Sequence, residues 1–540
     1  MAGRKYVERD SAVTALKTSL AVVLILLISL NSCSDLYRYQ IPQPILPDYR
    51  GIEQMYWKVW QIMAQDVKWR TRENGFSWRY INCEDDLLIH QYSTIQTALF
   101  GVYGSSQFPV MQSLDNFYRG QRTDGFISRV YNSLTGEYLH TPGIYEPMIN
   151  PPLFTWPELK YYRLTGDKSR LAKYFPVWEK YFSWLDNFCR ARGEAYPLYY
   201  NTANGSQMIN SSRNVNDLGA WVDMSSQMAF FAGHLAEIAT IINENSRAEY
   251  YQGRYQEIAE QIRQKLWDSD DSFYYDLTSA GQSIRIKTTA GYWTLIAGIP
   301  TREEAQELIK HLTDSDEFSR HHLFPTLAAD EDDFKSGGAY WRGGVWSSEN
   351  YMIIQGLKKY GEYEFATTAA WNHIINMEKV FESYITDTTL LDEKYHANCH
   401  NTVWELYSSE DDVPGTRWDT RFLSRPNYIP TSGHGPVAML IEEVLGFIVD
   451  APNDRLFWRP WLLNKHGIRN LKFGNNLLTI SCEKRENREA PLVIKGMTSS
   501  PFLLTIILGE DSVAIQQPRG RININLTSEN FMSIDTMSNN

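Results

Sequence analysis

Apolar residues between about residues 53 and 446 recur at intervals of three and four, which is the period of one buried helix face. Short turn sequences such as residues 164–167 separate these runs, and the stretch has neither a strand–helix alternation nor a strict repeat. The pattern predicts many amphipathic helices on a shared core, enough for a toroid of paired helices. The clearest runs are Phe175, Trp178, Phe182 and Leu185; Met228, Phe231, Leu235, Ile238 and Ile242; and Tyr255, Ile258, Ile262 and Leu266.

The periodicity changes after residues 451–454. Leu478, Ile480 and Cys482 alternate with their neighbours, and further short apolar runs follow between Asn, Gly and Pro residues. We expect a small β-sandwich over residues 452–527 that packs on the helical domain, and a frayed tail over 528–540. Structural support is the first interpretation of the sandwich, and separate sugar binding is the second.

The N-terminus has the pattern of a secretory signal. Basic residues precede a short apolar core at 20–30, and residues 30–33 (Leu-Asn-Ser-Cys) resemble a bacterial lipobox. We therefore expect a signal peptide over 1–32, lipidation of Cys33, and a Pro-containing tether over 33–52. An uncleaved anchor helix is the alternative. Both predict an exported protein held at a membrane, facing the periplasm or the cell surface.

Composition narrows the possible partners. The 540 residues carry a net charge of −12, which argues against nucleic acid, and 14% of them are aromatic, which fits carbohydrate binding. The five Cys include no Cys-x-x-Cys pair, and His396 and His400 lack a clear third ligand. We expect no metal and no cofactor.

The most informative stretch is 338–351, in which Trp341, Arg342, Trp346 and Asn350 surround a pair of glycines. Indole faces and a guanidinium suit a sugar ring, which offers apolar C–H faces and hydroxyls together. The alternative is a buried aromatic corner in which Arg342 pairs with a structural carboxylate.

This stretch resembles the Tyr-Trp-Arg-Gly-Pro-Val-Trp-Pro segment of glycoside hydrolase family 63 and its mannosylglycerate-hydrolase-like and trehalase relatives, with Gly344 and Ser347 at the two Pro positions. Other similar segments follow in the family's order. The resemblance implies an (α/α)6 barrel over residues 53–446, a glycoside or oligosaccharide substrate, and hydrolysis of an α-linkage with inversion. The other segments are 150–156, 271–276, 287–292 and 403–408.

The resemblance assigns the general base to Glu405, which follows Trp404; the alternative is a buried Glu that pairs with an Arg. The general acid does not carry over. Residues 206–213 resemble the family's Ser-Gly-Met-Asp-Asn-Ser-Pro-Arg segment, but Ile209 stands at the acidic position and has no proton to donate. Asp223 matches a different family Asp that is not the acid.

Three explanations stay open. The acid is Asp217, or it is another carboxylate, or the protein binds glycans without cleaving them. Trp341, Arg342, Trp346 and Asn350 are the expected substrate contacts, together with Gln121 and Asp124 on an early loop. A polysaccharide lyase is a third hypothesis, but no basic cluster stands beside Glu405 to support it. The other carboxylates considered are Asp85, Asp86 and Asp124.

Overall fold

The computed structural model describes residues 36–84, 87–139, 149–213, 217–383, 385, 387–418 and 420–533. The predicted signal peptide, the lipidation site Cys33 and the candidate acids Asp85 and Asp86 lie outside these ranges. Within them, no helix is both long enough and apolar enough to cross a membrane.

A ring of helices forms the inside of the large domain, and each helix packs on the next until the last packs on the first. Several of these helices are buried on all sides, as expected for helices that are themselves surrounded by helices. The ring consists of α3 (Gln91–Gly101), α5 (Thr155–Thr165), α8 (Val222–Ile241), α10 (Trp293–Ala297), α12 (Ser347–Lys359) and η7 (His434–Val444).

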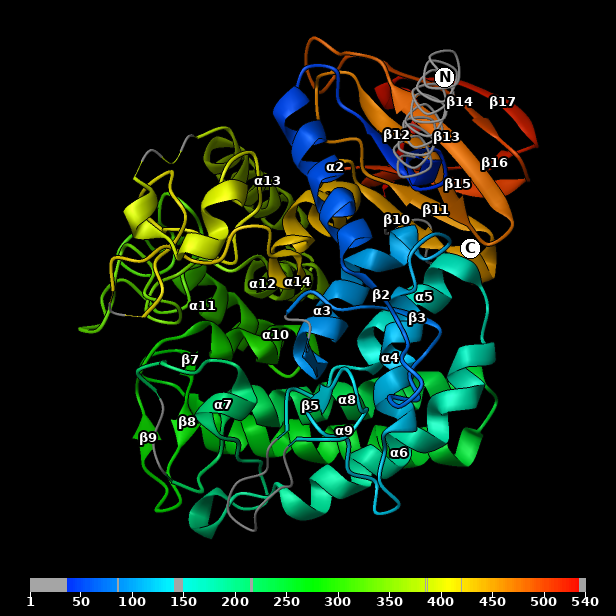
Figure 1. The fold of residues 1–540 in the computed structure, drawn as a ribbon. Coiled ribbons are helices and arrows are strands. Elements are labelled where there is room, and N and C mark those ends of the chain that lie inside the picture. Colours follow the sequence, from blue (N-terminus) through cyan, green and yellow to red (C-terminus); the bar gives the residue numbers. More distant parts are fainter. Residues whose placement is uncertain are drawn as a thin grey trace, which may run out of the picture.

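Outer helices cover the ring and bury one face each. In α9, Ile258, Ile262 and Leu266 are buried, whereas most of the polar residues between them are not. Helix α9 packs on α8, and α2 packs on both α13 and η7 (Figure 1). The predicted (α/α)6 barrel is therefore confirmed. The outer helices are α2 (Arg50–Gln65), α4 (Val110–Arg119), α6 (Ser169–Phe188), α9 (Asn245–Leu266), α11 (Arg302–Thr313) and α13 (Tyr363–Glu382).

The C-terminal part is a β-sandwich of two five-stranded sheets, as predicted (Figure 1). One sheet has the order β1-β12-β13-β14-β17 and the other β10-β11-β15-β16-β18. The strands are β10 (Phe447–Asp450), β11 (Arg455–Trp458), β12 (His466–Phe473), β13 (Asn476–Cys482), β14 (Leu492–Thr498), β15 (Phe502–Leu508), β16 (Asp511–Gln517), β17 (Gly520–Leu526) and β18 (Met532–Ser533), with β1 (Gln43–Ile45) from the N-terminal part.

Strand β1 changes the interpretation of the predicted tether. Residues 43–45 pair antiparallel with β12, with Pro44 opposite Ile468, and α2 begins at Arg50. The second half of the stretch 33–52 is therefore part of the folded body, because its backbone completes an edge of the sandwich. At the other end, β10 begins before residue 452 and β18 follows residue 527.

Long connections between helices carry small hairpins and most of the site described below. The described strands of this domain form two-stranded antiparallel sheets. They are β2 (Val67–Trp69), β3 (Arg79–Ile81), β4 (Leu88–His90), β5 (Val130–Asn132), β6 (Trp267–Asp268), β7 (Phe273–Tyr274), β8 (Asp276–Leu277) and β9 (Ser283–Ile284); the short helices α7 (Ala203–Ser206) and α14 (Ile429–Ser432) also lie in connections.

Candidate active site

Two of the segments selected from the sequence are joined by a backbone bridge. The N–H of Val345 donates to the carbonyl of Tyr407 (2.9 Å), and the N–H of Tyr407 donates back to Val345 (3.0 Å). This pairing sets Glu405 and Trp346 at the wall of one pocket. Of the residues that the family-like segments suggest for one site, Glu405, Trp341 and Trp346 line this pocket and Arg342 does not.

The turn before Trp341 is strained. Gly338, Ala339 and Tyr340 have φ values of 110°, 39° and 57°, and a left-handed conformation is costly for the two residues that carry a Cβ. Thr416 holds the turn, since its carbonyl accepts from the N–H of Tyr340 (3.0 Å) and its Oγ1 from that of Ala339 (3.1 Å). Such strain occurs typically at functional sites.

The strained turn positions an aromatic wall. The rings of Trp341 and Trp346 stack, with centroids 4.5 Å apart and planes inclined by 9°. The ring of Tyr340 also stacks with Trp346, at 5.9 Å between centroids, and meets Trp418 edge to face at 4.8 Å. These four rings line a pocket of about 190 Å3. The other lining residues are Glu84, His90, Tyr92, Gln207, Ile209, Glu405, Arg425, Tyr428 and Thr431.

Glu405 is held in a fixed orientation by Arg425. The guanidinium Nε donates to Oε2 (3.0 Å) and an Nη donates to Oε1 (2.6 Å), which is a two-pronged ion pair. A carboxylate offers about four acceptor sites, so this pair leaves capacity for a water molecule. The side chain is 4% exposed and lines the pocket. Glu405 thus has the features of both alternatives drawn from the sequence: it is a buried Glu that pairs with an Arg, and it is a carboxylate that faces the pocket.

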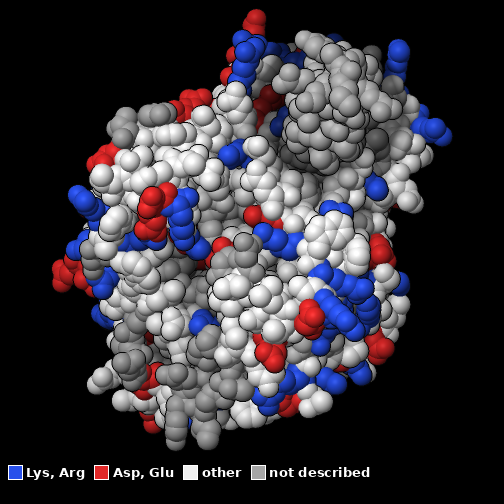
Figure 2. Space-filling view, viewed as in Figure 1, with Lys and Arg blue, Asp and Glu red and all other residues white. Residues whose placement is uncertain are grey.

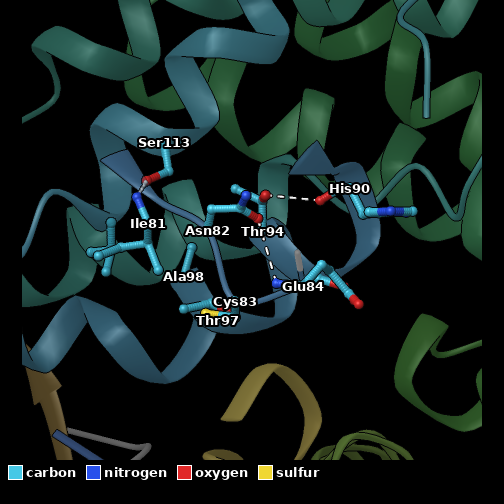
Figure 3. Close-up of a pocket in the computed structure, with 11 residues that line it drawn as sticks. Ile81, Asn82, Cys83, Glu84, His90, Thr94, Thr97, Ala98 and Ser113 are labelled. Carbon is cyan, nitrogen blue, oxygen red and sulfur yellow. Dashed lines mark hydrogen bonds between the residues drawn. The ribbon is translucent and has the colours of Figure 1, made fainter. Parts of the chain in front are cut away.

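Arg425 also binds a second carboxylate, Glu84, at 2.9 Å. Burial alone would raise the pKa of Glu84, but the charges of Arg425 and His90 and the hydroxyls of Ser93 and Tyr428 outweigh it and lower the pKa to about 2. Glu84 is therefore ionised at neutral pH. Figure 3 shows the side chain of Glu84 on the segment that follows β3 and that of His90 at the end of β4, directly before α3.

The segment that should carry the acid faces the same pocket. The side-chain amide of Asn210 donates to the carbonyl of Ala339 (2.8 Å), and its Oδ1 accepts from the N–H of Trp341 (3.2 Å). This clamp fixes the residue before it, Ile209, at the pocket wall, where it is 42% exposed. An apolar side chain therefore stands where the resemblance places the proton donor.

The two aspartates proposed at first do not line this pocket. Asp217 accepts from the backbone N–H of Ser279 (2.8 Å) in a distant loop. Asp124 lies in a surface turn, where it pairs with Arg122 (2.9 Å) and caps the N–H of Phe126. Both predictions are corrected here: Asp124 satisfies a backbone N–H of its own turn, and Asp217 satisfies a backbone N–H of another loop.

Three predicted substrate contacts also have structural roles. Gln121 donates to the carbonyls of Gly125 (3.0 Å) and Val177 (2.8 Å), and so ties its loop to α6. Arg342 donates from Nε to the carbonyl of Asn210 (3.2 Å). Asn350 is fully buried and donates to the carbonyl of Leu323 (3.0 Å). The three side chains support the loops around the pocket and are not among the residues that line it, whereas Trp341 and Trp346 are.

Sequence reasoning missed Arg425, Tyr428 and His90. Arg425 and Tyr428 lie in the Ser-Arg-Pro-Asn-Tyr stretch that follows the Trp404–Glu405 pair, and their link to Glu84 spans more than 340 residues. No local pattern indicates such a contact. The one local signal in the sequence is the acidic run before β4 that contains Glu84. In the structure an ion pair with Arg425 holds the side chain of Glu84, which is therefore not a solvated loop residue.

Among the described residues, no group of three or more His, Cys, Asp or Glu side chains converges as a metal site. The thiols of Cys83, Cys189, Cys399 and Cys482 are free.

Comparison with known proteins gives consistent matches. Residues 194–411 match the family described as "Mannosylglycerate hydrolase MGH1-like glycoside hydrolase domain". An uncharacterised protein of Borreliella burgdorferi is 26% identical over 444 residues, which cover 82% of this chain and 88% of that protein. The mannosylglycerate hydrolase of Thermus thermophilus is 38% identical over 107 residues, which are 19% of this chain and 24% of the hydrolase.

A similar fold occurs in a solved structure of a family 63 mannosylglycerate hydrolase from Thermus thermophilus in complex with glucose. Its TM-score is 0.53, and the match covers 72% of this chain and 98% of that one at 17% identity. This likeness is one of fold. The structural match covers 98% of the solved protein, whereas the sequence match to the mannosylglycerate hydrolase covers 24% of that enzyme.

Proposed function

We propose that this protein is an inverting glycoside hydrolase that removes one sugar unit from a small α-linked glycoside. The chain belongs to the superfamily of (α/α)6 barrels that contains glycoside hydrolase family 63 and the mannosylglycerate-hydrolase-like enzymes. The observation that carries the proposal is the position of Glu405, an oriented carboxylate in an aromatic pocket. The pocket volume of about 190 Å3 lies below the roughly 300–1,000 Å3 of sites for drug-sized ligands, so one sugar ring fills it.

In this proposal Glu405 is the general base. Its carboxylate accepts a proton from a water molecule as that water attacks the anomeric carbon from the face opposite the leaving group. Arg425 orients the carboxylate, and the stacked indoles of Trp341 and Trp346 form the apolar wall of the pocket that takes the sugar. Configuration at the anomeric carbon is inverted because the water and the leaving oxygen are on opposite faces.

The proton for the leaving oxygen comes from His90 in this proposal. Apart from the cationic Arg425, the titratable residues that line the pocket in the described part of the chain are two glutamates, one histidine and three tyrosines. Glu84 has lost its proton, since its pKa is about 2, and Glu405 serves as the base. Burial raises the pKa of Tyr92, Tyr340 and Tyr428 above its ordinary value, which makes them weaker acids. Histidine is the most common side chain in general acid–base catalysis.

A leaving-group series tests both roles. We expect Glu405→Gln to reduce kcat/KM for aryl α-glucosides and α-mannosides by about 10²–10⁴-fold whatever the leaving group. His90→Gln should leave fast turnover of substrates with acidic phenols and lose it progressively as the phenol becomes less acidic. The control is His321→Gln, an imidazole 42% exposed that pairs with Asp412. Parallel behaviour of His90→Gln and wild type across the series would exclude His90 as the acid.

A second candidate function is glycan binding with weak catalysis. Ile209 is the observation that favours it, because the pocket wall is apolar where the resemblance requires an acid. The same series separates the two candidates. If the protein only binds glycans, calorimetry still shows affinity for the sugar, but neither wild type nor His90→Gln turns over substrates with poor leaving groups.

We also propose that the protein is exported and anchored through Cys33. The support is the sequence pattern of residues 1–33, which lie outside the described residues. A tethered enzyme of this kind meets its glycoside substrate outside the cytoplasm.

A further inference from the structure

A second cavity lies between the barrel and the sandwich. Its volume is about 640 Å3, more than three times that of the pocket at Glu405, and within the range of small-molecule sites at domain interfaces. The start of α13 forms one wall, and three connections of the sandwich form the others. The lining residues used below are Tyr363, Glu364, Arg459, Trp461, Arg485 and Arg488. We call it the interdomain cavity.

Two arginines of this cavity, the half-buried Arg459 and the buried Arg485, have no carboxylate partner for the guanidinium Nε among the described residues. The Nε atoms of Arg459 and Arg485 are buried and have no hydrogen-bond partner in the described part of the chain. Arg485 is 5% exposed, and its Nη atoms donate to the carbonyls of Pro460 (2.8 Å), Leu462 (3.4 Å) and Arg488 (3.4 Å), so its charge is paired with carbonyl dipoles and not with a carboxylate. Burial lowers the pKa of both arginines, whereas the ion-paired Arg425 has a raised pKa. An anionic group in the cavity would compensate this cost.

The cavity also offers surfaces for a sugar ring. The guanidinium of Arg459 lies over the ring of Tyr363, 3.8 Å from its centroid, which fixes its position. The indole of Trp461 lines the same space and is partly exposed. Three glutamates of the lining, Glu362, Glu364 and Glu510, are acceptors for hydroxyl groups. A guanidinium, an indole and carboxylates together are the groups that recognise a polyhydroxylated ring with a negative charge.

One ion pair at the rim is suited to exchange. Arg488 and Glu364 are 3.4 Å apart, and their side chains are 64% and 79% exposed. An ion pair as exposed as this one contributes little to stability. A ligand carboxylate can therefore replace Glu364 as the partner of Arg488 with little loss of free energy.

We propose that the interdomain cavity binds an acidic oligosaccharide of two or three units, whose carboxylate pairs with Arg459 and Arg488 and whose ring packs on Trp461. This second site is separate from the pocket at Glu405 and does not depend on the function proposed for that pocket. It gives the sandwich a role in holding a glycan chain in addition to supporting the barrel.

Calorimetry with two defined probes tests the proposal. The acidic probe is a hyaluronan tetrasaccharide, and the neutral probe is chitotetraose. We expect the full-length protein to bind the acidic probe at least tenfold more tightly than the neutral one, and the affinity to fall as salt rises. Arg459→Gln and Trp461→Ala should each weaken binding by about tenfold or more, and Arg488→Gln by less.

Controls separate the cavity from the rest of the surface. Arg521→Gln changes an exposed arginine of β17, and Trp69→Ala changes an indole that is 58% exposed; both should bind like wild type. Trp341→Ala should also leave this binding unchanged, because it alters the other pocket. Arg488 is on the surface, so its variant folds even if Arg459→Gln does not. Equal affinity for the two probes, or acidic-probe binding that none of the three cavity variants weakens, would overturn the proposal.

Discussion

Replacing Arg425 by Met should destabilise the protein, with a loss that depends on pH. Arg425 is the largest single influence that lowers the pKa of Glu84, and it binds Glu405 through two hydrogen bonds. Methionine keeps much of the volume and removes the charge. Two buried carboxylates, 14% and 4% exposed, then lose their counter-ion.

The magnitude follows from the pKa of Glu84. A shift from 4.5 to about 2 corresponds to about 3 kcal/mol of stability at pH 7. The folded pKa is lowered, so this stabilisation is fully present above the unfolded value of 4.5 and is lost as the pH falls through about 2. By pH 3 about 40% of it remains by the same linkage relation. Arg425 is the largest of several groups that lower this pKa, so the variant should lose on the order of 3 kcal/mol at pH 7 and clearly less at pH 3.

Urea unfolding followed by tryptophan fluorescence at pH 7 and pH 3 measures both values. Arg488→Met is the matched control, because it removes an arginine from the exposed pair with Glu364 and should change stability by less than about 1 kcal/mol. The reasoning fails if Arg425→Met unfolds at the same urea concentration as wild type at pH 7, or if its loss is equally large at pH 3.

Three further predictions follow from the site and the N-terminus. Ile209→Asp restores a carboxyl at the pocket wall and should raise turnover of unactivated α-glycosides more than turnover of glycosyl fluorides, whose leaving group needs little acid help; equal gains would argue against an acid role. Asp217→Asn should leave kcat/KM within about twofold of wild type, since its carboxylate caps Ser279; abolished turnover would identify Asp217 as the acid. Cys33→Ser should release the protein from membranes or block its processing, as seen by fractionation and mass; unchanged association and processing would support an uncleaved anchor.

The barrel could be predicted because its signal is repetitive. Runs such as Phe175, Trp178, Phe182 and Leu185 are buried in α6 as their spacing requires, and the alternation at Leu478, Ile480 and Cys482 is that of β13. Strand β1 was missed because three residues with a Pro among them carry too little pattern to show which sheet edge they complete.

Only the site residues that lie in short, distinctive segments of the sequence could be predicted. Trp341, Trp346 and Glu405 stand in short, distinctive segments, and all three line the pocket. Arg342 and Asn350 belong to the same segment but donate to backbone carbonyls: Arg342 follows the left-handed turn at 338–340, and Asn350 lies on a buried face of α12. A motif gives the segment that forms a site, and the turn geometry decides which of its residues reach the ligand.

Local sequence motifs do not predict ion pairs between residues that are far apart in the chain. The bond from Arg425 to Glu84 joins the stretch before α14 to the stretch before β4, and it depends on the closure of the helical ring between them. Asp217 and Asp124 show the converse. Each is a carboxylate near a plausible motif, and each accepts a backbone N–H: Asp124 within its own turn, and Asp217 from the loop that contains Ser279.

The stereochemistry of the first product tests the central claim most directly. Proton NMR of wild-type enzyme with a 4-nitrophenyl α-glycoside reports the anomer that is released before mutarotation. Direct attack by a water molecule activated by Glu405 predicts that the β-anomer appears first, and that Glu405→Gln releases neither anomer at a comparable rate. Initial release of the α-anomer, or undiminished release by Glu405→Gln, would contradict the assignment of Glu405 as the base of an inverting hydrolase.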